Sequence, residues 1–308
     1  MDLSSTVMII LFLLQTSIGA PANIFILMAY AHINQTEKNL KPADTILCHL
    51  VFANMLGLIT RVMSDFGLNH NHNDISCKLL FYIYRISRGV CICLTSFLSV
   101  HQAITLAPST SQWLSLKSRT KKYLIPCIIG FWLFNILLSV YILRVLYAQR
   151  NGTISGPHSK LGFCYSKSSF SSLALFFNII MNGHDVFFVG LMLSCSVYIL
   201  YVLKKHRDQV QYIRSTKQNS KMMAERTAAK NVITLVSLYV FCFGVDIGFI
   251  VYSGTVPIVP LLLAQIRVFV TSCYALLTPF IIISFNKRIY RRLKYSHNEE
   301  SVKHVNAN

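Results

Sequence analysis

Charged side chains inside otherwise apolar stretches are the feature of this sequence that could do chemistry. A charged group within a membrane is costly and usually faces the interior of a helix bundle or a water-filled cavity. The residues concerned are Arg61, Asp65, Arg85, Arg88, Arg144, Asp185, Asp246 and Arg267. They would either line a polar cavity that binds a ligand or form buried ion pairs that fix helix packing. Arg61 and Asp65, four residues apart, are expected to pair locally on one helix.

Polar residues also recur every three or four positions in several of these stretches, which places them on one helical face. If the helices form a bundle, the polar faces point at one another. The sequence therefore predicts a polar cavity in the outer half of the bundle. Its expected lining is Arg85, Arg88, Thr95, Asn178, Asn182, Asp185, Asp246, Arg267 and Thr271.

The arginines in these stretches outnumber the aspartates by two, if every one of them faces inward. A guanidinium in a low-dielectric site favours a carboxylate, sulfate or phosphate. A small ligand with an anionic group is therefore expected, with Arg88 as its best contact. The alternative is that Arg88 pairs with Asp185 or Asp246 and only holds helices together.

The composition indicates which elements position these residues. Of 308 residues, 54% are hydrophobic and 13% are charged, whereas a soluble domain carries about 25% charged residues. A helix needs about 20 mostly apolar residues to cross a bilayer. Seven stretches qualify, at residues 7–31, 43–66, 77–107, 123–147, 171–203, 227–252 and 260–284. The predicted fold is an all-α membrane protein: a seven-transmembrane helix bundle over residues 1–296 with a short polar tail at 297–308.

The loops assign an orientation. Nineteen Lys and Arg lie in the tail and in the loops of one face, against Arg150, Lys160 and Lys167 on the other. Because the basic face is cytoplasmic, the N-terminus is expected outside and the tail in the cytoplasm. The expected location is the plasma membrane, as a multi-pass protein. This topology accounts for the net charge of +18 without nucleic-acid binding.

Cysteines and sequons fit the same topology. Seven of the nine Cys fall inside predicted spans and are expected to be reduced, whereas Cys77 opens the third span on the outer side and Cys164 lies in the outer loop between the fourth and fifth spans. Two cysteines in an oxidising compartment predict a disulfide, and the alternative is two free thiols. The sequon at Asn151 is predicted to be glycosylated, and the cytoplasmic one at Asn34 is not.

Five segments carry a resemblance to a known family. They read TSFLSVHQAITLAP (95–108), HDVFFVGLM (184–192), HRDQVQYI (206–213), ERTAAKNVI (225–233) and CYALLTPF (273–280). Each resembles its counterpart in vomeronasal type-1 receptors, the pheromone receptors of mammals, which are G-protein-coupled receptors. The resemblance implies a small extracellular ligand and a heterotrimeric G protein of the inhibitory class. The expected G-protein-facing residues are His101, Gln102, Lys204, Lys205 and Arg226.

Departures from ordinary rhodopsin-like receptors agree with that family. The third segment ends with His101-Gln102-Ala103 in place of Asp-Arg-Tyr, and Asn54 replaces the Asp that binds sodium. A related bitter-taste-type receptor is the first alternative, although such receptors generally lack a cysteine like Cys77. The second is a small-molecule transporter, for which internal repeats are expected and none is found. No nucleophile motif, metal constellation or phosphate loop is present, so neither an enzyme nor a cofactor is expected.

Overall fold

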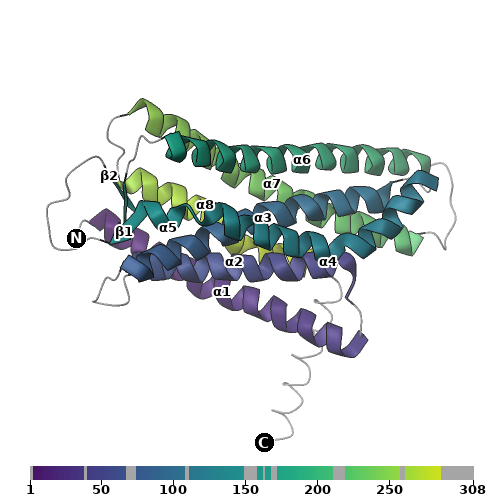
Figure 1. The fold of residues 1–308 in the computed structure, drawn as a ribbon. Helices are drawn as coiled ribbons and strands as arrows, with labels where there is room; N and C mark the ends of the chain where they lie inside the picture. The colour runs from purple at the N-terminus through teal and green to yellow at the C-terminus, as the bar shows by residue number, and fades with distance from the viewer. Residues whose placement is uncertain are drawn as a thin grey trace, which may run out of the picture.

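A computed structural model describes residues 3–37, 40–66, 74–107, 111–148, 158–161, 164–167, 172–210, 219–256 and 261–285. Seven long helices run side by side in this part of the chain (Figure 1). They are α1 (Leu3–Glu37), α2 (Pro42–Phe66), α3 (Asp74–Leu106), α4 (Ser111–Ser139), α6 (Ser172–Val210), α7 (Asn219–Thr255) and α8 (Leu261–Phe285). Each is long and apolar enough to cross a membrane, which confirms the predicted seven-helix fold.

Several helices extend beyond the stretches that the apolar pattern marks. Helix α4 begins at Ser111 rather than at residue 123, and it places Lys117 within its first turns. Helix α6 continues to Val210. An apolar run marks only the part of a helix that crosses hydrocarbon, because polar turns at either end lie in the headgroup region and beyond. The basic residues that indicated orientation therefore lie partly on helix ends rather than in loops.

The segment between α4 and α6 forms a small sheet that the sequence analysis did not predict. A short helix α5 (Ile142–Val145) leads into strand β1 (Leu146–Ala148), and β2 (His158–Leu161) and β3 (Cys164–Lys167) follow. The strands pair antiparallel in the order β1-β3-β2, with Ala148 opposite Cys164. Strand β1 also contacts α3. The end of the bundle that carries these strands is called the sheet end, and helix α1 begins there as well (Figure 1).

Helix α3 is the centre of the bundle. It contacts α2, α4, α6 and α7. In its most apolar 18-residue stretch 72% of the residues are buried, whereas the corresponding share in every other span is at most 50%. Its core side chains include Val90, Ile92, Leu94 and Leu98, all at most 1% exposed. Functional groups on α3 can therefore reach groups from most of the other helices.

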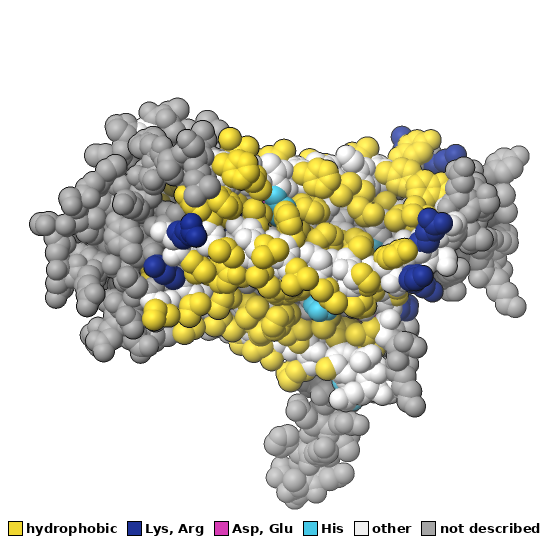
Figure 2. Space-filling model, viewed as in Figure 1, with side chains coloured by type: hydrophobic (Ala, Val, Ile, Leu, Met, Phe, Trp, Pro, Cys, Tyr) yellow, Lys and Arg dark blue, Asp and Glu magenta, His cyan; other side chains and the backbone are white. Residues whose placement is uncertain are grey.

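The outer surface of the bundle is apolar. Figure 2 shows a broad hydrophobic band between the two ends, with Lys and Arg gathered toward the ends. Exposed apolar side chains on α4 and α6 include Leu137, Ile179, Phe187 and Val197. Backbone polar groups within lipid must be satisfied inside the helix itself, so the band and the helices together identify a multi-pass membrane protein.

Candidate functional site

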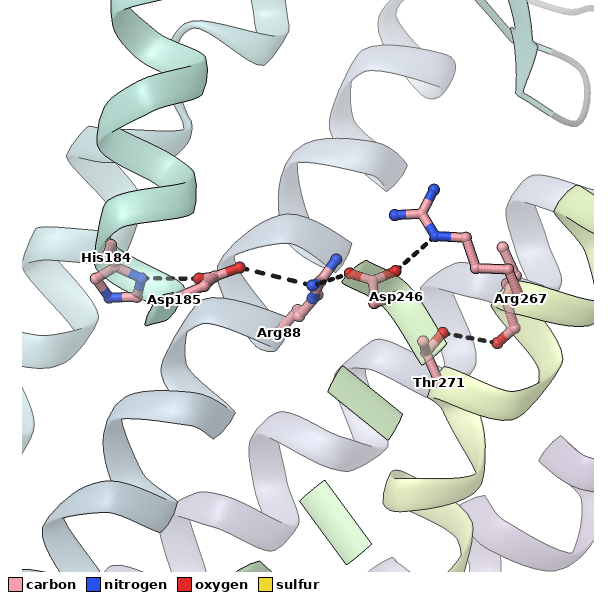
Figure 3. A network of polar contacts seen from close by, with 7 residues as sticks. Arg88, His184, Asp185, Asp246, Arg267 and Thr271 are labelled. Atoms are coloured by element: carbon pink, nitrogen blue, oxygen red, sulfur yellow. Dashed lines mark hydrogen bonds and ion pairs between the residues drawn. The ribbon is translucent and has the colours of Figure 1, made fainter. Parts of the chain in front are cut away.

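A chain of charged side chains crosses the bundle in its half nearer the sheet end (Figure 3). Arg88 on α3 donates a hydrogen bond to Asp246 on α7. A terminal nitrogen of Arg88 also lies 3.6 Å from Oδ2 of Asp185 on α6. From α8, Nε of Arg267 donates to Oδ1 of Asp246 at 2.5 Å. These contacts, here called the charged network, join α3, α6, α7 and α8.

The two carboxylates of the charged network are buried. Asp185 is 6% exposed and Asp246 is 3% exposed, and a buried charge requires partners. Asp246 has a guanidinium on each of its oxygens, from Arg88 and from Arg267. Both partners that sequence analysis considered for Arg88 therefore lie beside it, and the contact with Asp246 is the closer one. Holding these helices together is therefore one role of the charged network.

Among the described residues of this region, the arginines outnumber the carboxylates by one. Arg85 lies one turn before Arg88 on α3 and interacts electrostatically with Arg88 and Asp185. It makes no hydrogen bond or ion pair with a described residue. Counted among the described residues, these three guanidinium groups and two carboxylates carry a net charge of +1. The contact of Arg267 with Asp246 is made by Nε (Figure 3), and its terminal nitrogens make no hydrogen bond or ion pair with a described residue, so they remain available as donors.

A branch of the charged network reaches α4 through a histidine and a thiol. Nδ1 of His184 lies 2.9 Å from Oδ1 of Asp185, and Nε2 lies 3.3 Å from Sγ of Cys93. Asn135 on α4 donates from Nδ2 to Cys93 at 3.5 Å and to the carbonyl of Phe131 at 2.8 Å. The imidazole and thiol therefore orient the Asp185 carboxylate toward Arg88.

Sequence analysis missed this branch. It expected Cys93 only to be one of the reduced cysteines within the spans, and it assigned no role to Asn135 or to His184. The one available signal was the His184-Asp185 pair, because adjacent residues of these types within a span can bond to each other.

A cavity lies beside the charged network, between α2, α3, α7 and α8. Its empty volume is about 600 Å³, which includes the solvent at its open side. Mostly apolar pockets that carry a few polar groups are the usual sites for small-molecule ligands. Arg88 and Asp246 form the charged wall of this cavity, and Thr271 lies beside them. Its other lining includes Asn54, Tyr84, Ser87, Cys91, Tyr239 and Tyr274. Among the described residues, α6 contributes none to this lining.

Tyr274, which lines the cavity, forms a hydrogen-bonded pair with Thr95. The hydroxyl groups of Thr95 and Tyr274 lie 2.6 Å apart and connect α3 to α8. Thr95 also donates to the carbonyl of Cys91 at 2.7 Å. The polar faces of α3 and α8 therefore meet, although Thr95 is held by Tyr274 and does not line the cavity.

The structure does not bring every predicted ligand residue to this site. Asn182 is exposed on α6, so it is no part of the buried cluster, and the side chain of Asn178 lies outside the described residues. Arg144 is exposed at the sheet end instead of facing the bundle interior. Arg61 is buried on α2, with its guanidinium 5.9 Å from the ring of Phe12. The side chain of Asp65, its predicted partner, is not among those described.

The residues predicted to face a G protein lie toward the opposite end. Lys204 and Lys205 are exposed near the end of α6, whereas Gln102 on α3 is buried and His101 is half-buried. The side chain of Arg226, the whole of Asn151 and the tail at 297–308 fall outside the described part of the chain. Within the described residues, no cluster of His, Cys, Asp and Glu could hold a metal ion.

The cysteines divide as the sequence suggested. Cys48, Cys91, Cys93, Cys127, Cys195, Cys242 and Cys273 are free thiols. Cys77 is buried at the start of α3, and Cys164 is the first residue of β3. Because β3 pairs with β1 and β1 contacts α3, both cysteines belong to the same end of the bundle.

Comparisons with known proteins cover nearly the whole chain. Residues 6–295 match the model of the "Vomeronasal organ pheromone receptor family". The chain is 39% identical over 305 residues to "Olfactory receptor class A-like protein 1" of Danio rerio, covering 97% of this chain and 96% of that protein. It is 29% identical to "Vomeronasal type-1 receptor 3" of Homo sapiens, covering 90% of each. It is 30% identical to "Vomeronasal type-1 receptor 1" of Gorilla gorilla gorilla, covering 90% of this chain and 80% of that protein.

Proposed function

The chain belongs to the vomeronasal type-1 receptor family of chemosensory receptors, and we propose that this receptor binds a small anionic molecule beside Arg85 and then activates a heterotrimeric G protein. In this proposal the sheet end faces outward and admits the ligand. The opposite end, with Lys204, Lys205 and the end of α3, faces the G protein. The inhibitory class of G protein follows from the family resemblance.

The observation that supports an anionic ligand is the net positive charge of the cluster. Arg85, Arg88 and Arg267 face only Asp185 and Asp246 among the described residues. A ligand with a single negative charge would bring the cluster to neutrality, and a guanidinium binds a carboxylate well in a site of low dielectric. The donors left for it are the guanidinium of Arg85 and the terminal nitrogens of Arg267. Arg88, whose contacts are with Asp246 and Asp185, serves as the hub between helices.

The shared carboxylate supplies the route to a conformational change. Asp246 binds Arg88 on α3 and Arg267 on α8 at the same time. An anion that draws either guanidinium toward itself weakens one of these contacts, and α7 then becomes free to shift relative to α3 or α8. The ligand can move this equilibrium only by its difference in affinity for the two states. The shift along α7 reaches the opposite end of the bundle, where the G protein would bind.

The experiment compares small monocarboxylates with their uncharged primary amides on cells that express the chain, with G-protein activation as the readout. Arg85→Gln should leave the surface level near that of wild type, because Arg85 makes no ion pair with a described residue. The potency of acids should fall by about 10- to 100-fold, as for a lost hydrogen bond to a charged group. Arg85→Lys keeps the charge and should retain part of the response.

The matched control is Lys78→Gln, which removes a positive charge on the same helix close to the sheet end. It should change the potency of acids little. An equal loss toward acids and amides in Arg85→Gln, at a normal surface level, would show that the cluster serves packing alone.

A further inference from the structure

A buried amide one helical turn from the charged network has no partner for its donor among the described residues. Asn54 on α2 is 2% exposed and lines the cavity. Its Oδ1 accepts a hydrogen bond from Sγ of Cys91 at 3.1 Å. Its Nδ2 makes no hydrogen bond with any described residue. Buried polar groups are nearly always hydrogen-bonded, so this donor indicates a missing acceptor.

The surroundings of Asn54 leave room for that acceptor. The neighbouring lining residues Ala53 and Gly57 on α2 and Ala275 on α8 are small. A Cβ added to Gly57 would meet nothing closer than Ser87, at 3.8 Å. Because the thiol of Cys91 holds Oδ1, Nδ2 is the amide atom left to face this space. The site is thus a donor of fixed orientation beside an open, partly apolar volume.

The distance between the charged network and Asn54 sets the length of a ligand that could contact both of them. Arg88 and Cys91 both line the cavity and are one turn apart on α3, a rise of about 4.5 Å. Leu58, Tyr239 and Phe243 complete the apolar part of the wall. Arg85 lies one turn before Arg88 and is not part of the cavity lining, so a molecule that reaches from Arg85 to Asn54 passes Arg88 and then this apolar wall.

We propose that Asn54 is a ligand-binding residue that donates a hydrogen bond from Nδ2 to an uncharged acceptor oxygen of the ligand. That oxygen is a carbonyl, ether or hydroxyl oxygen, separated from the anionic group by an apolar spacer. This subsite rests on the proposed function, because it assumes that the anionic group lies beside Arg85.

The test uses straight-chain monocarboxylates of increasing length, each beside a counterpart in which an ether oxygen or a ketone replaces one methylene. Wild type should prefer the oxygen-bearing acid at one chain length by roughly 3- to 10-fold in potency, the size of one net hydrogen bond. Asn54→Leu should abolish this preference, so that the oxygen-bearing acid is no more potent than the plain acid of the same length. Asn54→Asp, which also lacks the amide donor, should abolish it too.

Two further variants separate the subsite from general effects on folding. Cys91→Ala keeps the amide but removes the thiol that orients it, so the preference should shrink. Ser96→Ala is the matched control, because Ser96 is fully buried, its hydroxyl has no hydrogen-bond partner among the described residues, and it is not part of the cavity lining. It should keep the preference of wild type.

A wild type with no preference at any length, or an Asn54→Leu variant that keeps the preference, would overturn the subsite. In the second case a water molecule is the partner of Nδ2. If Arg85→Gln still weakens the response to all acids, the subsite alone has failed. If wild type responds to no acid at all, the anionic ligand fails and the subsite fails with it.

Discussion

A Cβ added to Gly89 would lie 1.9 Å from Oδ1 of Asn135, so α3 and α4 meet at a residue that has no side chain. Close approach through small residues is a general device of membrane helices. Here it brings the Asn135 amide to Cys93, and through Cys93 to the imidazole of His184. The glycine next to Arg88 thereby supports the orientation of Asp185 on another helix.

Gly89→Ala should therefore lower the thermal stability and surface level of the receptor. Overpacking of a tight contact costs about 1–3 kcal/mol, and the variant should show this as a reduced melting temperature of the purified protein. Gly130→Ala on α4 is the control, since a Cβ there meets nothing within 4 Å. Equal melting temperatures of the two variants would show that α3 and α4 are not in close contact at Gly89.

Asp246→Asn should be the most damaging single change in the charged network. It leaves Arg88 and Arg267 without the carboxylate that they share, and breaking a buried pair costs about 3–5 kcal/mol. Asp185→Asn should cost less, because Arg88 lies farther from Asp185, at 3.6 Å. Surface level and melting temperature measure both. A tolerated Asp246→Asn beside a destabilised Asp185→Asn would reverse the assigned importance of the two contacts.

Cys77 and Cys164 should form a disulfide. Strand β3 begins at Cys164 and pairs with β1, which contacts the helix that carries Cys77. Closing a loop of this length stabilises a protein by roughly 4–5 kcal/mol in the chain-entropy model. Peptide mapping without reduction should recover the two cysteines in one linked fragment. Alkylation of both thiols before reduction would contradict the pairing.

Glycosylation tests which end of the bundle faces the outside of the cell. With the sheet end outside, Asn151 is accessible to the glycosylation machinery and Asn34 is not. Asn151→Gln should therefore remove a glycosidase-sensitive shift in electrophoretic mobility, whereas Asn34→Gln should leave that shift in place. The opposite pattern would place the sheet end in the cytoplasm.

The seven spans could be predicted because apolar runs of this length rarely occur outside membrane-spanning helices. Helix rotation could not be predicted in the same way. Asn182 and Asp185 share a rhythm of three to four residues, but on α6 Asp185 is buried and Asn182 is exposed. A polar stripe spaced over two turns covers a wide arc, and only packing against α3 decides which part of the arc faces inward.

Contacts between helices were also beyond the sequence. Nothing local to Asp246 shows that it binds arginines on both α3 and α8, because that depends on how three helices are placed around it. The approach of Asn135 to Gly89 is of the same kind. The strands of the sheet were missed because they have only three or four residues each, too few to show an alternating pattern.

The central claim is that the unmatched positive charge at Arg85 binds the anionic group of the ligand. The most direct measurement is the melting temperature of the purified receptor with increasing concentrations of an activating monocarboxylate or its primary amide. A ligand that binds only the folded state raises stability by about 2.7 kcal/mol at a hundred times its Kd. The acid should stabilise wild type, and Arg85→Gln should lose this stabilisation while its melting temperature without ligand stays the same. Equal stabilisation of wild type and Arg85→Gln by the acid would contradict the claim.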